Sequence, residues 1–142
     1  MASGRHIVLV ACCGLKRREA SAARDLYQSA LFRFARRWAE RHSPEDWYIL
    51  SAKHGLLAPL TRIEPYDETL ATVGVRGRRE WDERVLLAVR PLRPDAITVL
   101  AGANYCGWCE AFPNVVRPLR GLGIGRQLAW FKAALCRPPE TS

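Results

Sequence analysis

Three apolar runs along the chain have the pattern of strands that are buried on both faces. Residues 7–12 are continuously apolar and rich in β-branched side chains, and residues 47–52 and 96–101 repeat this pattern. Such continuous runs are typical of strands in a parallel sheet that is covered on both sides. Residues 114–117 predict a short fourth strand, which ends at Pro118.

Segments with helical spacing separate these strands. In residues 25–42 apolar positions recur every three or four residues and four arginines occupy the other side, which predicts one long amphipathic helix. The same spacing predicts helices over residues 77–89 and 124–135. Residues 56–75 show no clean period and contain two prolines, so we expect a long ordered connection there, of a kind that often carries function.

The alternation of strands and helices predicts a single three-layer α/β domain over residues 1–137. We expect a mostly parallel sheet of about four strands flanked by helices, because right-handed crossovers place helices on the faces of such a sheet. Residues 138–142 are expected to form a disordered tail. Ligands of parallel α/β sheets bind beyond the carboxyl ends of the strands, so candidate chemistry is sought there.

Composition adds a bias toward anionic partners and excludes several classes. The 142 residues suit one globular domain, and 22 basic against 14 acidic side chains give a net charge of +8. Only three of the basic residues are lysines, and an arginine-rich chain can also reflect the codon composition of a genome. No apolar run approaches the roughly 20 residues that span a bilayer, and five cysteines suggest free thiols, so we expect a cytoplasmic protein without membrane contact.

The first two strands are each followed by polar residues with catalytic or binding potential. Cys13 and Lys16 follow the first strand, where backbone N–H groups beside a cation predict an anion cradle, and Cys13 would be a nucleophile if its pKa were lowered. Ser51, Lys53 and His54 follow the second strand. Lys53 is a candidate for acid–base or electrostatic catalysis, and His54 is a candidate general acid or base. The alternative is that these thiols and cations only pack or face solvent.

Two further segments supply a carboxylate and aromatic rings. Tyr66 and Asp67 lie in the long connection. Tyr66 is a candidate ring for stacking on a base, and Asp67 either caps a turn or assists proton transfer at an N-glycosidic bond. Gly102 and Tyr105 follow the third strand and predict a close backbone approach beside a ring that stacks on a base. Packing of Tyr105 against a helix is the competing interpretation.

The last candidate motifs are a cysteine pair and a glycine turn. Cys106 and Cys109 form a C-x-x-C after a strand, which is typical of thiol-redox motifs. A zinc site that added Cys12 and Cys13 would need adjacent side chains to point the same way, so no metal is expected. Three alternating glycines (Gly121, Gly123 and Gly125) lead into the last helix and allow backbone amides to face a phosphate, although their spacing is not a dinucleotide fingerprint.

Five segments together resemble a small bacterial and phage domain family of unknown function. They are LVACC at residues 9–13, RDLYxSxLF at 24–32, WYILSAKHGLLxP at 47–59, IxPYDxTL at 63–70 and PLxGLGIGxQLAW at 118–130. The portion from Ser51 to Tyr66 is more distantly similar to the YaaA family of peroxide-stress proteins. That similarity implies DNA binding and resistance to oxidative damage, and the chain is considerably shorter than the members of that family.

Three functional hypotheses follow. The first is an enzyme that binds a nucleoside, a nucleotide or another anionic small molecule at the strand ends and acts on an N-glycosidic bond, with no cofactor. The second is a non-catalytic DNA- or RNA-binding protein that contacts phosphates through arginines of the first helix: Arg33, Arg36, Arg37 and Arg41. The third is a thiol-redox protein that uses Cys106 and Cys109. No oligomeric state is indicated.

Overall fold

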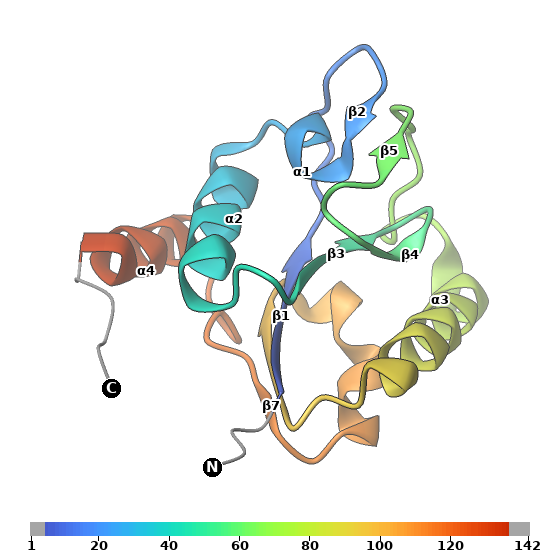
Figure 1. The fold of residues 1–142 in the computed structure, drawn as a ribbon. Helices are drawn as coiled ribbons and strands as arrows, with labels where there is room; N and C mark the ends of the chain where they lie inside the picture. The colour runs from blue at the N-terminus through green and yellow to red at the C-terminus, as the bar shows by residue number, and fades with distance from the viewer. Residues whose placement is uncertain (1–4, 137–142) are drawn as a thin grey trace.

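The central strand of the molecule is β1 (His6–Ala11), which is buried because all of its middle residues are apolar. In the computed structural model, which describes residues 5–136, β1 pairs in parallel with β3 (Trp47–Ser51) on one side and with β6 (Ala96–Leu100) on the other. The three predicted buried strands are confirmed, and they lie side by side at the centre of the sheet (Figure 1).

Two short strands complete the main sheet at its edges. β7 (Val115–Val116) pairs in parallel with β6, as the fourth predicted strand, and β4 (Gly55–Leu57) pairs antiparallel with β3. The sheet therefore has five strands in the order β4-β3-β1-β6-β7, one more than expected. Gly55, with φ at +75°, turns the chain back immediately after β3, which the apolar pattern alone does not reveal.

The long connection after β3 is more structured than the sequence predicted. It contains β4 and also β5 (Arg62–Ile63), which pairs antiparallel with β2 (Ser21–Ala22) in a separate two-stranded sheet. The connection expected over residues 56–75 is ordered, and its first part also contains these two short strands. Both small strands are too short for a periodic pattern to be visible.

The predicted helix over residues 25–42 is two helices. α1 (Ala23–Leu26) ends at Tyr27, whose extended backbone forms a bridge with Lys16, and α2 (Ala30–His42) begins after Ser29. The Ser29 hydroxyl accepts a hydrogen bond from the backbone N–H of Phe32 at 3.1 Å and so caps α2. The helical spacing continues across the break, which is why the sequence predicted one helix.

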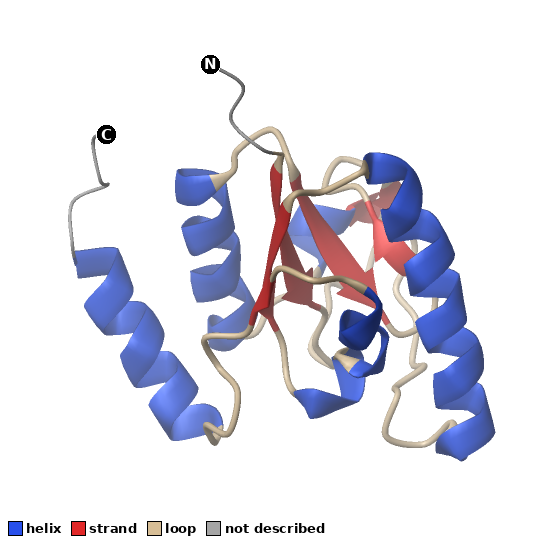
Figure 2. Cartoon of the chain, turned by 90° about the horizontal axis from the view of Figure 1, so that it is seen from below, coloured by secondary structure: helices blue, strands red, loops and turns tan. Residues whose placement is uncertain are grey.

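Helices cover both faces of the sheet, which confirms the α/β class (Figure 2). α2 and α4 (Ile124–Cys136) pack together on one face, and α3 (Gly74–Val89) covers the other. Each presents buried apolar residues inward, such as Phe32 from α2, Phe131 from α4 and Trp81 from α3.

Three short 3₁₀ helices complete the described elements: η1 (Arg90–Leu92), η2 (Ala103–Tyr105) and η3 (Gly107–Ala111). Within residues 5–136 no helix is long and apolar enough to cross a membrane. The predicted tail at residues 138–142 lies outside the described residues.

The strand order creates a switch point beside β1. From β1 the chain moves to β3 on one side, and from there it crosses to β6 on the opposite side of β1. The loops that leave the carboxyl ends of β1 and β6 therefore diverge, which opens a crevice between them. This crevice is the place at which the fold predicts a ligand.

Candidate functional site

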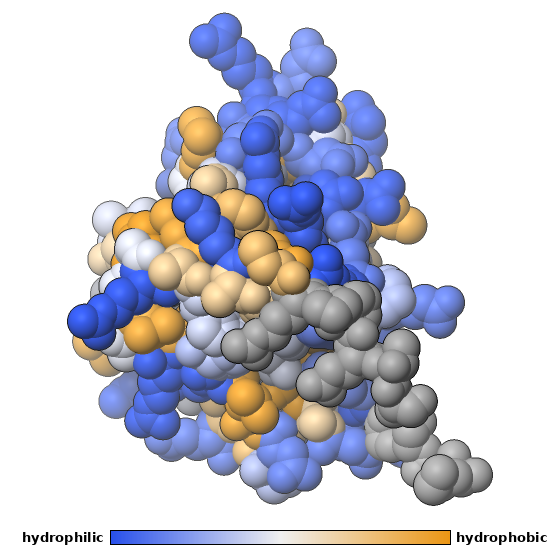
Figure 3. Space-filling model, turned by 90° about the vertical axis from the view of Figure 1, so that its left-hand side faces the viewer, coloured by the Kyte–Doolittle hydropathy of each residue, from blue (hydrophilic) through white to orange (hydrophobic). Residues whose placement is uncertain are grey.

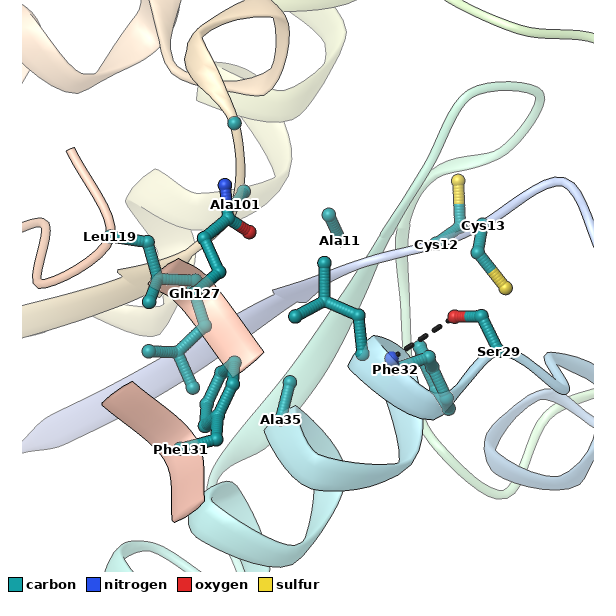
Figure 4. A pocket seen from close by; sticks show the side chains of 13 residues that line it. Ala11, Cys12, Cys13, Ser29, Phe32, Ala35, Ala101, Leu119, Gln127 and Phe131 are labelled. Carbon is teal, nitrogen blue, oxygen red and sulfur yellow. Dashed lines mark hydrogen bonds between the residues drawn. The ribbon is translucent and has the colours of Figure 1, made fainter. Parts of the chain in front are cut away.

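An apolar hollow of about 60 Å³ lies at the switch point. It is enclosed by the end of β1, the start of α2, the loop after β6 and the side of α4 (Figure 4). Its polar groups come from Cys12, Cys13, Ser29 and Gln127, and Gly102 also lines it. The hollow lies where the chain topology predicts a crevice.

A polar hollow of about 100 Å³ adjoins it and shares Cys12 and Cys13. Its remaining lining residues are Gly14, Lys16, Asp67, Glu68, Thr69 and Tyr105. Four residues selected from the sequence thus meet in one place: Cys13, Lys16, Asp67 and Tyr105. They come from three segments that are far apart along the chain, so the fold and not local sequence brings them together.

A chain of three buried hydroxyl groups lies beside the polar hollow. The Tyr66 hydroxyl is 2.5 Å from that of Tyr27 and 2.6 Å from that of Ser51, which has no exposed surface. Burial raises the pKa of Tyr27 to about 12 and raises the pKa of Tyr66 still further above its usual value. Both phenols are therefore neutral at physiological pH, and they act as hydrogen-bonding groups.

Lys16 is positioned by this aromatic pair. Its Nζ atom lies 4.4 Å from the centre of the Tyr66 ring and 5.8 Å from that of Tyr27, and it donates to the carbonyl of Gly14 at 3.4 Å. An ammonium group over aromatic faces is attracted by the ring quadrupole. The Tyr66 ring therefore packs against the Lys16 ammonium group. Because Tyr66 is only 7% exposed, its ring has no face open to solvent.

Tyr105 closes the other side of the polar hollow. Its hydroxyl lies 3.4 Å from Cys12 Sγ, and its ring meets Trp81 edge to face with centroids 5.5 Å apart. Burial raises the pKa of the Tyr105 phenol, so it too remains neutral. Cys13 Sγ donates to the carbonyl of Leu15 at 3.2 Å.

Lys53 and His54 do not line the polar hollow. Lys53 is exposed and borders a third hollow of about 260 Å³ together with Trp81 and Arg84. His54 is half-buried, its backbone N–H donates to Ser51 Oγ at 3.1 Å, and its ring lies edge-on to Tyr66. Burial, followed by the nearby Lys53 charge, lowers the pKa of His54 below its usual value, so the ring is largely neutral near pH 7.

The glycine turn lies at the same edge of the sheet. Gly121 has φ at +77°, and the backbone N–H of Gln127 donates to the carbonyl of Gly123 as α4 begins after the turn (Figure 2). Gly123 and Gly125 have no heavy atom within 4 Å of where a Cβ would stand. The turn brings Gln127 to the apolar hollow, so it adjoins the site from the α4 side.

Three of the four arginines proposed to contact nucleic acid are bonded within the chain. Arg33 donates to Gln28, Arg36 forms ion pairs with Asp25 and Glu40, and Arg41 donates to the carbonyl of Leu135. Arg33 and Arg37 are nevertheless exposed. Figure 3 shows apolar and hydrophilic side chains interspersed on the face that carries α4, without one continuous hydrophilic surface.

Sequence reasoning selected neither Glu68 nor Gln127 as a residue of the site. Glu68 lines both the polar hollow and the third hollow, and Gln127 supplies an amide to the apolar hollow. The position of Glu68 beside Asp67 was the available signal, whereas nothing in the sequence distinguishes Gln127 from any other polar helix residue. Cys106 and Cys109 are buried and line none of these three hollows.

Comparison with known proteins places the chain in one family. Residues 7–133 match a family model described as "Family of unknown function (DUF6884)". No curated protein and no solved structure matches the chain. In the described part of the chain, no group of three or more His, Cys, Asp or Glu side chains is arranged to hold a metal ion. The matched segment contains every residue of the polar hollow, and the chain belongs to this family of unknown function.

Proposed function

We propose that the switch-point edge binds a nucleoside or nucleotide and acts on its N-glycosidic bond. The observation that carries the proposal is the polar hollow, in which Lys16, Cys13, Asp67 and Tyr105 converge from separate segments. A cation, two carboxylates and one neutral phenol in one crevice match the mixed chemistry of a nucleotide, which offers a phosphate, sugar hydroxyls and a base.

The carboxylates are suited to the bond-breaking step. Cleavage of a glycosidic bond develops positive charge on the sugar, and a carboxylate next to that sugar stabilises it. Asp67 and Glu68 both reach the polar hollow and are exposed, so they are available to a ligand. In the proposed reaction the departing base takes up a proton, and the sugar passes to water or to a second acceptor.

Lys16 and the glycine turn fit the anionic end of the ligand. Lys16 is held over Tyr66, and the turn before α4 exposes backbone that no side chain covers at Gly123 and Gly125. Ligand pockets usually enclose about 300–1,000 Å³. The hollows of about 60 and 100 Å³ therefore hold parts of a nucleotide, and the remainder would lie across their openings.

Thermal unfolding in the presence of candidate ligands tests the proposal. We expect nucleosides or nucleotides to raise Tm, because a ligand at 100 times its Kd adds about 2.7 kcal/mol to stability. Asp67→Asn should retain that shift and lose release of free base, as followed by chromatography. Lys16→Met should weaken the binding of nucleotides more than that of nucleosides. Lys132→Met, the matched control, should leave the binding of both unchanged. Absence of a Tm shift with every nucleobase, nucleoside and nucleotide would contradict the proposal.

Binding of DNA or RNA is the second candidate. It is favoured by the exposure of Arg33 and Arg37 on α2 and by the resemblance of residues 51–66 to the YaaA family. In that case affinity should fall steeply between about 50 and 200 mM salt, because phosphate contacts release counterions. Arg33→Glu combined with Arg37→Glu should abolish binding, while Lys16→Met should have little effect. If Lys16→Met instead abolishes binding and the double arginine variant has little effect, the result supports the small-ligand site.

A further inference from the structure

Cys106 and Cys109 lie together in the turn that follows β6. The backbone N–H of Cys109 donates to the carbonyl of Cys106 at 3.1 Å, which is the tight turn that opens η3. Cys106 Sγ donates to the carbonyl of Gly102 at 3.3 Å, and the two cysteines are only 5% and 8% exposed. The turn packs on α3, and neither thiol belongs to the hollows at the switch point.

Opposite charges flank this pair of thiols. Arg117, which follows β7, and Asp82 of α3 act on both sulfurs through their opposite charges. Asp82 lies so close to the backbone of Gly107 that an added Cβ would overlap its carboxylate. Gly107 thus allows the carboxylate to approach the turn that carries both cysteines.

Two buried polar atoms at this place have no partner among the described residues. They are Asp82 Oδ1 and Arg117 Nε. A buried polar atom without a partner is destabilising, so nearly all such atoms in proteins are paired. Both belong to the two charged groups that flank Cys106 and Cys109, whereas the third such atom among the described residues, Arg24 Nε, lies in α1.

The electrostatics divide the roles of the two thiols. The neighbouring Cys109 thiol, followed by the Arg117 charge, lowers the pKa of the Cys106 thiol despite its burial, and the same pairing raises the pKa of Cys109. Burial raises the pKa of the Asp82 carboxyl, although Arg78 and the backbone of Trp108 lower it. Cys106 is thus the favoured thiolate, Cys109 retains its proton, and Asp82 is a strengthened proton acceptor.

We propose that Cys106 and Cys109 form a reversible dithiol–disulfide centre that exchanges with low-molecular-weight disulfides. The Cys106 thiolate attacks one sulfur of the small disulfide, whose S–S bond breaks, and a mixed disulfide forms while one small thiolate leaves. Cys109 gives its proton to Asp82 and attacks Cys106 Sγ, which releases the second small thiolate. Two protein thiols lose two electrons, the small disulfide gains them, and both released thiolates take up protons.

The burial of the sulfurs defines the class of oxidant. At 5% and 8% exposure, a protein-sized disulfide cannot reach them, and a small one reaches them when η3 opens locally. η3 is a short 3₁₀ helix of five residues, which is a form with poor hydrogen-bond geometry. This centre is independent of the function proposed for the switch-point hollows.

Thiol mapping in glutathione redox buffers tests the centre. The full chain is equilibrated with increasing oxidised glutathione, quenched, alkylated and mapped by mass spectrometry. We expect a Cys106–Cys109 disulfide that forms and reverts with the buffer, also in Cys136→Ser. In Cys109→Ser a mixed disulfide with glutathione should accumulate on Cys106. The exposed Cys136 reports that the oxidant is active.

The positioning roles of Arg117 and Asp82 are tested by the pH dependence of Cys106 alkylation and by the rate at which the mixed disulfide is converted. Arg117→Gln should move the pH midpoint of Cys106 alkylation upward, and Arg117→Lys, which retains the charge, should restore it. Asp82→Asn should slow conversion of the mixed disulfide into the internal one without slowing its formation. The proposal is overturned if Cys106 and Cys109 remain alkylatable while Cys136 becomes glutathionylated, or if the disulfide joins other cysteines. Far-ultraviolet circular dichroism confirms that each variant is folded.

Discussion

Tyr66 connects the buried core to the candidate site through one hydroxyl group. That hydroxyl bonds to Ser51 and Tyr27, and the ring lies beneath Lys16. Residue type and position were sufficient to select Tyr66 from the sequence. The direction of the Tyr66 side chain was not predictable, because the sequence does not show that Ser51 and Tyr27 both lie next to its hydroxyl. The interpretation of Tyr66 as a stacking ring accordingly remains a prediction, and the structure adds a supporting role.

Tyr66→Phe tests this hydroxyl. The substitution leaves two buried hydroxyls without their shared partner, so we expect a loss of about 1–3 kcal/mol in the free energy of unfolding. Tyr48→Phe is the matched control, because the half-buried Tyr48 hydroxyl donates to Asp46 at the longer distance of 3.3 Å. Urea denaturation of both variants gives the comparison. Equal losses in the two variants would refute the special role of the Tyr66 hydroxyl.

Asp46 provides a pH-dependent contribution to stability. Arg5 bonds to both of its carboxylate oxygens, at 2.7 and 2.8 Å, and this pairing lowers the pKa of Asp46 below its usual value. A carboxyl whose pKa is lower in the folded state stabilises the protein above its unfolded pKa of about 3.9. That contribution is lost as the pH falls through the folded pKa.

The stability difference between wild type and Asp46→Asn should therefore be constant near neutral pH and should shrink below about pH 4. Urea denaturation between pH 2 and pH 7 measures it. In an Arg5→Gln background the same substitution should produce no such pH dependence. A difference that persists unchanged at low pH would show that the ion pair is not its source. Arg5 is exposed and Asp46 is only partly buried, so the effect is expected to be small.

At the scale of elements, the sequence predicted long units and missed short ones. The three buried strands and the helices after them were found because each has several residues of one period. β4 was missed because three residues after Gly55 cannot show a period, and the break between α1 and α2 was hidden by continuous helical spacing. The cap at Ser29 was the available signal for that break.

Two glycines before α4 provide a matched pair of substitutions. Gly121 has φ at +77°, a region that L-residues avoid, whereas Gly123 does not, and both have open space where a Cβ would stand. Gly121→Ala should therefore cost about 1–2 kcal/mol from backbone strain alone. Gly123→Ala should be neutral or stabilising by up to about 1 kcal/mol. Thermal unfolding of the two variants checks the order, and a larger loss in Gly123→Ala would contradict this account of the turn.

At the scale of the whole molecule, the meeting of the strand-end loops was predictable and their detailed chemistry was not. The rule that parallel strands present their carboxyl ends at one edge placed Lys16 and Tyr105 together, as the structure does, whereas Asp67 comes from the long connection, which the rule does not place. It could not separate Lys53 from them, because the direction of each loop depends on packing against α3 and Trp81. It also gave no indication that Glu68 would add a second carboxylate to a site expected to favour anions.

The last prediction concerns whether α4 folds together with the sheet. Phe131 of α4 is fully buried, stacks on Phe34 of α2 and lines the apolar hollow. Phe131→Ala should cost about 3–5 kcal/mol, whereas Leu87→Ala, at an exposed position of α3, should change stability by at most about 0.5 kcal/mol. If the chain is one cooperative domain, urea unfolding followed by tryptophan fluorescence and by circular dichroism shifts to the same lower midpoint in Phe131→Ala. A separate early loss of helical signal would instead mean that α4 unfolds independently. The site at the switch point would then depend on a helix that can unfold while the sheet stays folded.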